Sequence, residues 1–479
     1  MRRNKIKNLQ NILLATNQYG GDMFYPPAAI WEENIGIKDA RRAWQQLAEN
    51  INSKTAAQDK VGLYLHIPFC VTKCLYCNCI SIPQSESNIH ESYLDCIERE
   101  IIALKIPKGI KIKTFCIGGG TPSILSAKNL EKMFKLARDN FNLSECEQTM
   151  IEISPSTITP DKIKVLKNNA VNKITIGVQM LDEKLLCRYN RPQTKKMVFG
   201  VYKKIREAGI KYINIDLLAG LHGQNISSFL KDLDEIIKLK PDTIHINPFA
   251  PLFFTPYAMG GGNYVRGDVE RRMEMVELGN RRIAESYPFA QEREGHEKEN
   301  QQLFNIARLN SSVIGLGWGA LSHARSFLQY AKKNYLKNYK NLNRGLDSYI
   351  KNIKRNKFPI FYGCRIGREE EMRGNLIRSL ETEGIIEKRK FADLFGEDPV
   401  KIFPQEFKLL EELGAIKKNR NDIIEIKAES RLDYFIYSMV FYAEKHIRKI
   451  RKSLKGKILG IESARKKLEI NFCNEPILY

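Results

Sequence analysis

The chain has 479 residues, a length typical of two or three folding units. Hydrophobic residues make up 43% and charged residues 28%, which excludes a largely disordered chain. No apolar run approaches the roughly 18 residues of a membrane span, so we expect a cytoplasmic protein without a membrane partner. The net charge of +22 could attract nucleic acid or a polyanionic small molecule, but the abundance of lysine favours a solvated basic surface and makes nucleic acid the weaker interpretation.

Six short segments rich in β-branched residues predict buried strands, and amphipathic segments with helical spacing lie between them. The strands are expected at residues 62–68, 114–119, 149–154, 173–179, 212–218 and 243–249. Strands that alternate with helices predict an α/β fold with a parallel sheet wrapped by helices. Five right-handed crossovers in succession favour a partial (β/α)6 barrel related to the TIM barrel.

The barrel is expected to span residues 60–325. Residues 1–59 are predicted to form an N-terminal extension that packs on the barrel, and residues 326–479 a mostly helical C-terminal domain. Within that domain, residues 404–427 resemble the helix and hairpin of a winged helix, a shape that does not by itself imply DNA binding.

Polar and glycine-rich residues occur at the carboxyl end of each predicted strand. In chain order these are the cysteine-rich stretch after residue 68, GGGTPS (118–123), Glu152, Gln179, Asp216 and NPFAP (247–251). Because the active sites of barrels lie at this end, six strands in phase predict a single site there.

Four cysteines lie close together in the stretch CVTKCLYCNC (70–79). Since an intracellular chain keeps its thiols reduced, this group indicates a metal site rather than disulfides. The spacing C-x3-C-x2-C lacks the second pair of a zinc ribbon, which leaves zinc as the weaker alternative. Three soft thiolates suit an iron–sulfur cluster, and three on a four-iron cube leave one iron free to bind a substrate. We predict that Cys70, Cys74 and Cys77 hold a 4Fe–4S cluster, and that Cys79 has a substrate-side role without binding iron.

The three cysteines, with the aromatic Tyr76 before the third, resemble the signature of the radical S-adenosylmethionine (radical SAM) enzymes. This resemblance implies the same partial barrel and S-adenosylmethionine bound to the free iron through its amino and carboxylate groups. It also implies that one electron from the cluster cleaves the sulfonium, and that the resulting 5′-deoxyadenosyl radical abstracts hydrogen from an unactivated carbon.

From residue 60 to about 325 the chain is similar to the oxygen-independent coproporphyrinogen III oxidase family. The motifs that carry this similarity are YLHIPFCVTKCLYCNC, FCIGGGTPS, IEISP, IGVQMLDEKLLCRYNR, NIDLLAGLHGQ and GLGWGALSHA. The similarity implies an oxidoreductase of porphyrin and haem biosynthesis that decarboxylates tetrapyrrole propionates, with flavodoxin or ferredoxin as electron donor. It implies that one S-adenosylmethionine is surrounded by Tyr64, Gly119, Glu152, Ala250 and Leu321, and a second one by Tyr76, Gly120, Thr121, Gln179, Arg191 and Asp216.

A few local features bear on which member of this family the chain resembles. Cys79 and the YPP stretch (25–27) match the oxidases, in which that N-terminal segment lies near the substrate, whereas haem chaperones commonly have an aromatic residue in place of Cys79. The stretch NQQLFNIARLNSSV (300–313) lacks the tyrosine- and threonine-rich pattern of the oxidases. The alternatives are a related methyltransferase or cyclopropanase that uses two S-adenosylmethionine molecules, a haem chaperone and, more remotely, a nucleic-acid-modifying enzyme. His66 is as compatible with a satisfied core residue as with a functional one.

Overall fold

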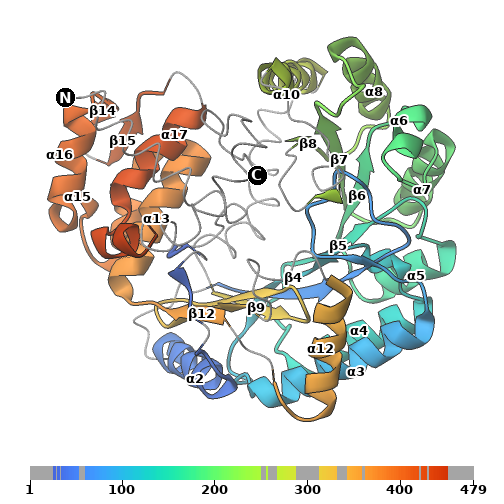
Figure 1. The fold of residues 1–479 in the computed structure, drawn as a ribbon, viewed down its shortest axis with the longest axis horizontal. Helices are drawn as coiled ribbons and strands as arrows, with labels where there is room; N and C mark the ends of the chain where they lie inside the picture. The colour runs from blue at the N-terminus through green and yellow to red at the C-terminus, as the bar shows by residue number, and fades with distance from the viewer. Residues whose placement is uncertain are drawn as a thin grey trace, which may run out of the picture.

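The computed structural model describes residues 25–27, 30–32, 34–52, 60–249, 255–256, 267–286, 312–331, 342–358, 362–419, 422–428 and 431–450. All six predicted strands are present, and consecutive ones pair in parallel, which confirms the predicted fold class (Figure 1). They are β1 (Val61–Ile67), β4 (Ile112–Gly119), β5 (Gln148–Ile153), β6 (Lys173–Gln179), β7 (Tyr212–Ala219) and β8 (Thr243–Pro248). Their apolar side chains are buried in one large core, as expected for strands covered on both faces.

Amphipathic helices connect the strands and line the outer side of the curved sheet (Figure 1). They are α3 (Ser87–Leu104), α4 (Ala127–Asn140), α5 (Pro160–Asn168), α6 (Glu183–Arg188), α7 (Lys195–Glu207), α8 (Ile226–Lys238) and α10 (Gly267–Ser286). Several begin at a side-chain cap that the sequence supplies, because an oxygen of the capping residue accepts a hydrogen bond from a free backbone N–H of the first turn. Ser126, Asp182, Thr194 and Asn225 cap α4, α6, α7 and α8 in this way.

Four further strands extend the sheet beyond β1. The strand β9 (Ser312–Leu316) pairs in parallel with β1, and β10 (Leu321–Ala324), β11 (Leu328–Ala331) and β12 (Tyr362–Arg365) follow in antiparallel order. The expected domain boundary at residue 325 therefore falls inside the sheet. The helix α2 (Ile37–Asn52) packs on this extension, where the indole of Trp44 donates to the hydroxyl of Tyr330 at 3.0 Å. The helix α12 (Leu342–Lys354) packs against α3.

The C-terminal unit has its own hydrophobic core and lies beyond the β12 end of the sheet (Figure 1). Its elements are α13 (Arg368–Glu383), β13 (Ile385–Glu387), α14 (Lys388–Phe395), α15 (Pro399–Ile402), α16 (Pro404–Glu412), β14 (Ile416–Asn419), β15 (Ile423–Ile426), α17 (Arg431–Ser438) and the short 3-10 helix η4 (Met439–Phe441). The expected helix and hairpin are α16 and β14–β15, and β13 joins the hairpin as a third strand. This order of helices and strands is that of a winged helix.

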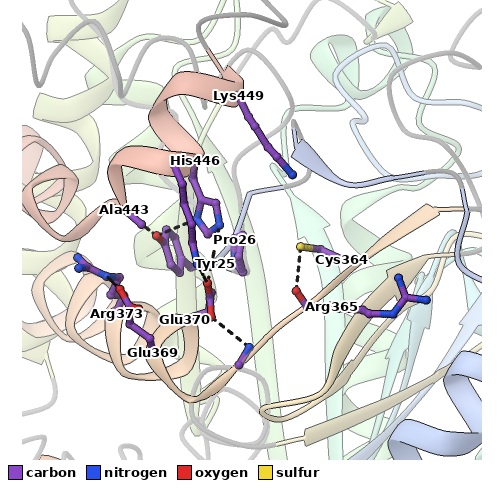
Figure 2. A network of polar contacts seen from close by, with 12 residues as sticks. Tyr25, Pro26, Cys364, Arg365, Glu369, Glu370, Arg373, Ala443, His446 and Lys449 are labelled. Atoms are coloured by element: carbon purple, nitrogen blue, oxygen red, sulfur yellow. Dashed lines mark hydrogen bonds and ion pairs between the residues drawn. The ribbon is translucent and has the colours of Figure 1, made fainter.

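The segment at Tyr25 ties the beginning of the chain to its C-terminal unit (Figure 2). The Tyr25 ring is buried in the C-terminal core, and its hydroxyl accepts a hydrogen bond from the Ala443 amide at 2.8 Å. The same hydroxyl lies 3.0 Å from Nδ1 of His446, while Gln329 of β11 donates to the Tyr25 carbonyl at 2.8 Å. The YPP stretch is thus an anchor between the sheet extension and the C-terminal unit.

Candidate active site

The cysteine stretch forms a loop at the carboxyl end of β1. It begins at β2 (Phe69–Cys70), which pairs in parallel with β3 (Ile82–Pro83), so that both ends of the loop are fixed side by side. The loop borders a cavity of about 310 Å³. The cavity is also lined by residues from the carboxyl ends of β4, β5, β6, β7 and β8, which is where a barrel carries its active site.

Most of the predicted site residues line this cavity. They are Cys70, Cys74, Tyr76, Cys77, Cys79, Gly119, Gly120, Thr121, Glu152, Gln179, Arg191 and Asp216. Tyr64 lies on β1, where its hydroxyl contacts Nδ1 of His66 at 3.0 Å, and Leu321 lies on β10 against the C-terminal core; neither belongs to the cavity wall. Ala250 lies outside the described residues.

The loop between α6 and α7 holds the cysteine loop in place. The Leu75 amide donates to the Tyr189 carbonyl at 3.1 Å, and the Thr72 hydroxyl donates to the Asn190 carbonyl at 2.9 Å. The side-chain amide of Asn190 donates a hydrogen bond to the Lys73 carbonyl at 3.1 Å. Asn190 has a φ of 56°, in the left-handed region that asparagine tolerates better than most residues. These contacts fix the backbone that carries Cys74 and Cys77.

Each of the three predicted ligand thiols has a different polar neighbour. The Thr121 hydroxyl donates to Cys70 Sγ at 3.4 Å, the Arg191 guanidinium to Cys74 Sγ at 3.9 Å and the Lys73 ammonium to Cys77 Sγ at 3.7 Å. Burial raises the pKa of the Cys70 thiol. The pKa of Cys77 is well below its usual value, mainly because the Cys79 thiol bonds to it, with further help from the Lys73 charge. Donors around sulfur are a means by which proteins tune an iron–sulfur cluster.

Glycines bring the loop after β4 close to the first cysteine. The amides of Gly120 and Thr121 donate to the carbonyls of Ile67 and Phe69, each at 2.8 Å. A Cβ at Gly120 would lie 2.6 Å from the Phe69 carbonyl oxygen and 2.9 Å from Cys70 Sγ, closer than such atoms can approach. Only glycine leaves the cysteine in its present position.

Arg191 is fixed by four partners on one side of the cavity. Besides Cys74, it donates to the Tyr76 hydroxyl at 3.1 Å, to Oε1 of Gln193 at 2.8 Å and to the Gly177 carbonyl. The Gly177 carbonyl is in reach because β6 has an irregular register between Gly177 and Gln179, where Gln179 has a φ of 70°. Such strain in a non-glycine residue is typical of functional sites.

Two carboxylates also line the cavity. Oδ1 of Asp216 accepts a hydrogen bond from the buried Asn214 at 2.7 Å and lies 3.3 Å from Nδ1 of His245. Oε2 of Glu152 accepts from the Gly119 amide at 3.3 Å. With Arg191, these groups present both charge signs to the cavity, as the binding of an amino acid moiety requires.

The structure adds lining residues that sequence reasoning missed. They are Lys73, Ser81, Ser154, Ser156, Thr157 and Thr175, together with nearby backbone and apolar groups, whereas Asn247 of the expected NPFAP stretch also lines the cavity. Ser154 ends a predicted strand and Ser156 lies two residues beyond it, so their place in the chain was an available signal. His66, by contrast, is a satisfied core residue, since its other ring nitrogen, Nε2, bonds to the Ile80 carbonyl at 2.8 Å and its side chain is 5% exposed.

The thiols fit a multi-iron cluster. Within the described residues, no three His, Cys, Asp or Glu side chains are grouped as ligands of a single metal ion. Cys70, Cys74 and Cys77 all line the same cavity, and each sulfur has a nearby hydrogen-bond donor. Cys79, on the same loop, is exposed. Three thiolates and adjoining free space match the donor set of a cluster that keeps one iron open.

Residues 64–247, from β1 to β8, match the family model of the Radical SAM superfamily. The chain therefore contains a region that is similar to the radical SAM superfamily. The resemblance expected from the motifs is also confirmed. The chain is 26% identical over 416 residues to the oxygen-independent coproporphyrinogen III oxidase of Escherichia coli, and the match covers 81% of this chain and 86% of the relative.

The chain is also similar to proteins that have a different name. It is 26% identical over 378 residues to the heme chaperone HemW of Bacillus subtilis, covering 75% of this chain and 93% of the relative. The solved structure of the coproporphyrinogen III oxidase HemN from Escherichia coli matches with a TM-score of 0.71 at 22% identity, over 88% of this chain and 96% of that one. This likeness shows the fold. None of the helices in the described ranges combines the length and apolar character needed to cross a bilayer.

Proposed function

We propose that this protein is an oxygen-independent coproporphyrinogen III oxidase-like enzyme of haem biosynthesis. The observation that carries the proposal is the convergence of the cysteine loop and five other strand ends on one cavity, in a chain similar to such oxidases over most of its length. In the proposed reaction each propionate gives one hydrogen atom to a 5′-deoxyadenosyl radical and one electron to a one-electron acceptor, loses carbon dioxide and becomes a vinyl group.

Cys70, Cys74 and Cys77 would hold a 4Fe–4S cluster. When bound, such a cluster supplies the electron that cleaves S-adenosylmethionine into methionine and a 5′-deoxyadenosyl radical. Gly120 leaves room beside Cys70, and the loop after α6 fixes the other two thiols through Leu75 and Thr72. The chain's contribution is therefore a rigid set of three thiolates beside a confined space.

Glu152 and the backbone at Gly119 would bind the cluster-bound S-adenosylmethionine. A carboxylate suits its ammonium or ribose hydroxyls, and glycine allows the ligand to approach the backbone. Gln179, Arg191 and Asp216 lie on the same cavity and would surround a second molecule, with Arg191 placed to pair with a carboxylate. Two S-adenosylmethionine molecules are thus part of the proposal.

The test is product analysis on anaerobically purified protein. Iron and sulfide are measured first; the reconstituted protein is then reduced and incubated with S-adenosylmethionine and coproporphyrinogen III. We expect 5′-deoxyadenosine together with a tetrapyrrole that has lost carbon dioxide, detected by mass spectrometry. A Cys74→Ala variant should form neither product, whereas Cys187→Ala, at an exposed cysteine of α6, serves as a matched control. Release of 5′-deoxyadenosine without decarboxylation would contradict the assigned substrate.

Two other activities have specific support. The match to HemW over nearly the whole of that relative favours a haem chaperone, for which haem should bind tightly without cleavage of S-adenosylmethionine. The residues available for a second S-adenosylmethionine favour a methyl- or methylene-transferring enzyme, whose signature would be S-adenosylhomocysteine beside 5′-deoxyadenosine. The same incubation, followed by absorbance spectra with added haem, separates the three.

The electron donor and the substrate-side thiol complete the proposal. A flavodoxin or a ferredoxin would reduce the cluster in the cytoplasm, and a tetracarboxylate substrate would be drawn to a chain with a net charge of +22. Cys79 lines the cavity and would act near the substrate.

A further inference from the structure

Lys73 occupies an unusual position among the thiols. It stands between the first two cysteines of the motif, and its side chain is half-buried at the cavity wall. The ammonium Nζ donates to the Cys79 carbonyl at 2.6 Å and to the Ser81 hydroxyl at 2.9 Å. It also lies 3.7 Å from Cys77 Sγ. One side chain thus spans the loop from its first turn to its exit.

These contacts have two physical consequences. The first is mechanical, because the bonds to Cys79 and Ser81 fasten the segment that leaves the third cysteine. The second is electrostatic, because a positive charge close to a thiolate favours whichever state of the bound group is more negative. A reduced cluster carries one more negative charge than an oxidised one. The nearby cation therefore favours the reduced state.

The three thiols do not share this environment equally. Cys70 receives a hydrogen bond from the neutral hydroxyl of Thr121, while Cys74 lies next to Arg191, whose other donors are bound to Tyr76, Gly177 and Gln193. Lys73 donates to a carbonyl and a hydroxyl and lies 3.7 Å from the Cys77 sulfur. Its ammonium group therefore places a positive charge beside Cys77, as Arg191 does beside Cys74.

We propose that Lys73 is a positioning residue that fastens the exit of the cysteine loop and, through its charge beside Cys77, raises the reduction potential of the cluster. The inference rests on the proposed function only in that the three cysteines hold a 4Fe–4S cluster. The step concerned is the transfer of one electron from a low-potential carrier of the flavodoxin or ferredoxin class to the oxidised cluster.

The experiment is a redox titration of the reconstituted full-length protein without S-adenosylmethionine, followed by electron paramagnetic resonance. Lys73→Met removes the charge but keeps most of the stem, and Lys73→Arg keeps the charge. Lys162→Met is the matched control, because that half-buried lysine donates to the carbonyls of Ser123 and Thr157 instead of a thiol. Iron content and circular dichroism are measured for every variant.

For Lys73→Met we expect the ratio of reduced to oxidised cluster at a fixed potential to fall about tenfold, which is about 59 mV for one electron. Lys73→Arg and Lys162→Met should titrate like the wild type. A Lys73→Met protein with full iron content and the wild-type potential overturns the proposal.

If Lys73→Met folds but does not retain iron, Lys73→Arg decides the question. Retention in the arginine variant supports a requirement for the charge, and loss in both variants overturns it. If the wild type itself assembles no cluster, it is the proposed function that fails.

Discussion

At the scale of single residues, the cavity depends on close approaches that leave no room for larger side chains. Gly120 is the tightest of these at the cysteine loop, since its missing side chain is what allows Cys70 to face the cavity. The same backbone holds Thr121 within reach of the Cys70 sulfur at 3.4 Å. The backbone at Gly120 and Thr121 therefore determines both the position of the Cys70 thiol and its hydrogen bond.

Gly120→Ala should displace Cys70 and lower the amount of cluster retained. The added Cβ would collide with backbone as well as sulfur, so the loop has to shift, and we expect a loss of stability of about 1–3 kcal/mol. Iron quantitation and urea unfolding measure the two effects. Gly109→Ala is the control, because its Cβ would meet nothing within 4 Å. Equal iron content in the two variants would show that the close contact at Gly120 is not required for the cluster to be retained.

The four clustered thiols should separate into two groups. Alanine at Cys70, Cys74 or Cys77 removes a ligand and should abolish cluster binding together with activity. Cys79→Ala should retain the cluster, because Cys79 is not expected to bind iron: a fourth thiolate would close the iron on which the chemistry depends. The variant should lose turnover, because Cys79 is expected to act near the substrate. Iron and sulfide quantitation of the reconstituted variants reports cluster content, and a Cys79→Ala protein that cannot assemble a cluster would contradict this division.

At the scale of elements, local sequence predicts the strands well and their meeting points less well. The six barrel strands were predictable because each is a short β-branched run, and their carboxyl ends could be placed at one site from topology alone. The three cysteines proposed as cluster ligands were chosen from their spacing, and the structure places them on one cavity. The hydrogen bond from Lys73 to Ser81 could not be predicted from local sequence, since it depends on the pairing of β2 with β3. The irregular register of β6 at Gln179 is likewise a tertiary feature.

Tyr25→Phe should loosen the contact between the N-terminal segment and the C-terminal unit (Figure 2). Burial lowers the pKa of His446 to about 4, so its imidazole is neutral at pH 7 and can accept from the tyrosine hydroxyl. Phenylalanine keeps the ring but leaves the Ala443 amide and the imidazole unpaired, which costs about 1–3 kcal/mol. Urea unfolding measures this loss.

Tyr434→Phe is the control for that variant. It removes a hydroxyl of the same unit that makes no hydrogen bond within the described part of the chain, so we expect little change. Equal stability of the two variants would mean that the Tyr25 hydroxyl adds nothing to the anchor.

At the scale of the whole molecule, the two hydrophobic cores are joined by contacts that local sequence patterns do not predict. Ala331 of β11 and Tyr362 of β12 belong to the C-terminal core although their strands extend the barrel sheet. The bond between Tyr25 and Ala443 spans 418 positions. Sequence patterns describe neighbours along the chain, so they did not predict this continuity, which crosses the expected limit at residue 325.

Two carboxylates of the C-terminal unit have shifted pKa values of opposite sign. Burial alone would raise the pKa of Glu371, but the buried His323 at 2.6 Å and the Ser326 amide lower it from 4.5 to about 2. Burial raises the pKa of Glu381 from 4.5 to about 7 despite a hydrogen bond from Ser438. Glu371 therefore stabilises the protein above pH 4.5, and this contribution is lost as the pH falls toward 2.

Glu381 acts in the opposite direction, and Glu381→Gln should reveal it. The folded state holds the proton of Glu381 up to about pH 7, whereas the unfolded chain releases it near pH 4.5, so wild-type stability falls as the pH rises through this window. Glutamine resembles the protonated acid and cannot ionise. The free energy of unfolding of the variant should match that of the wild type near pH 4 and exceed it at pH 8 by at most about 3 kcal/mol.

Urea unfolding at both pH values measures the difference. Glu383→Gln, which changes an exposed carboxylate of the same helix, is the control for net charge. Parallel loss of stability in the wild type and Glu381→Gln would show that Glu381 ionises alike in the folded and unfolded chain.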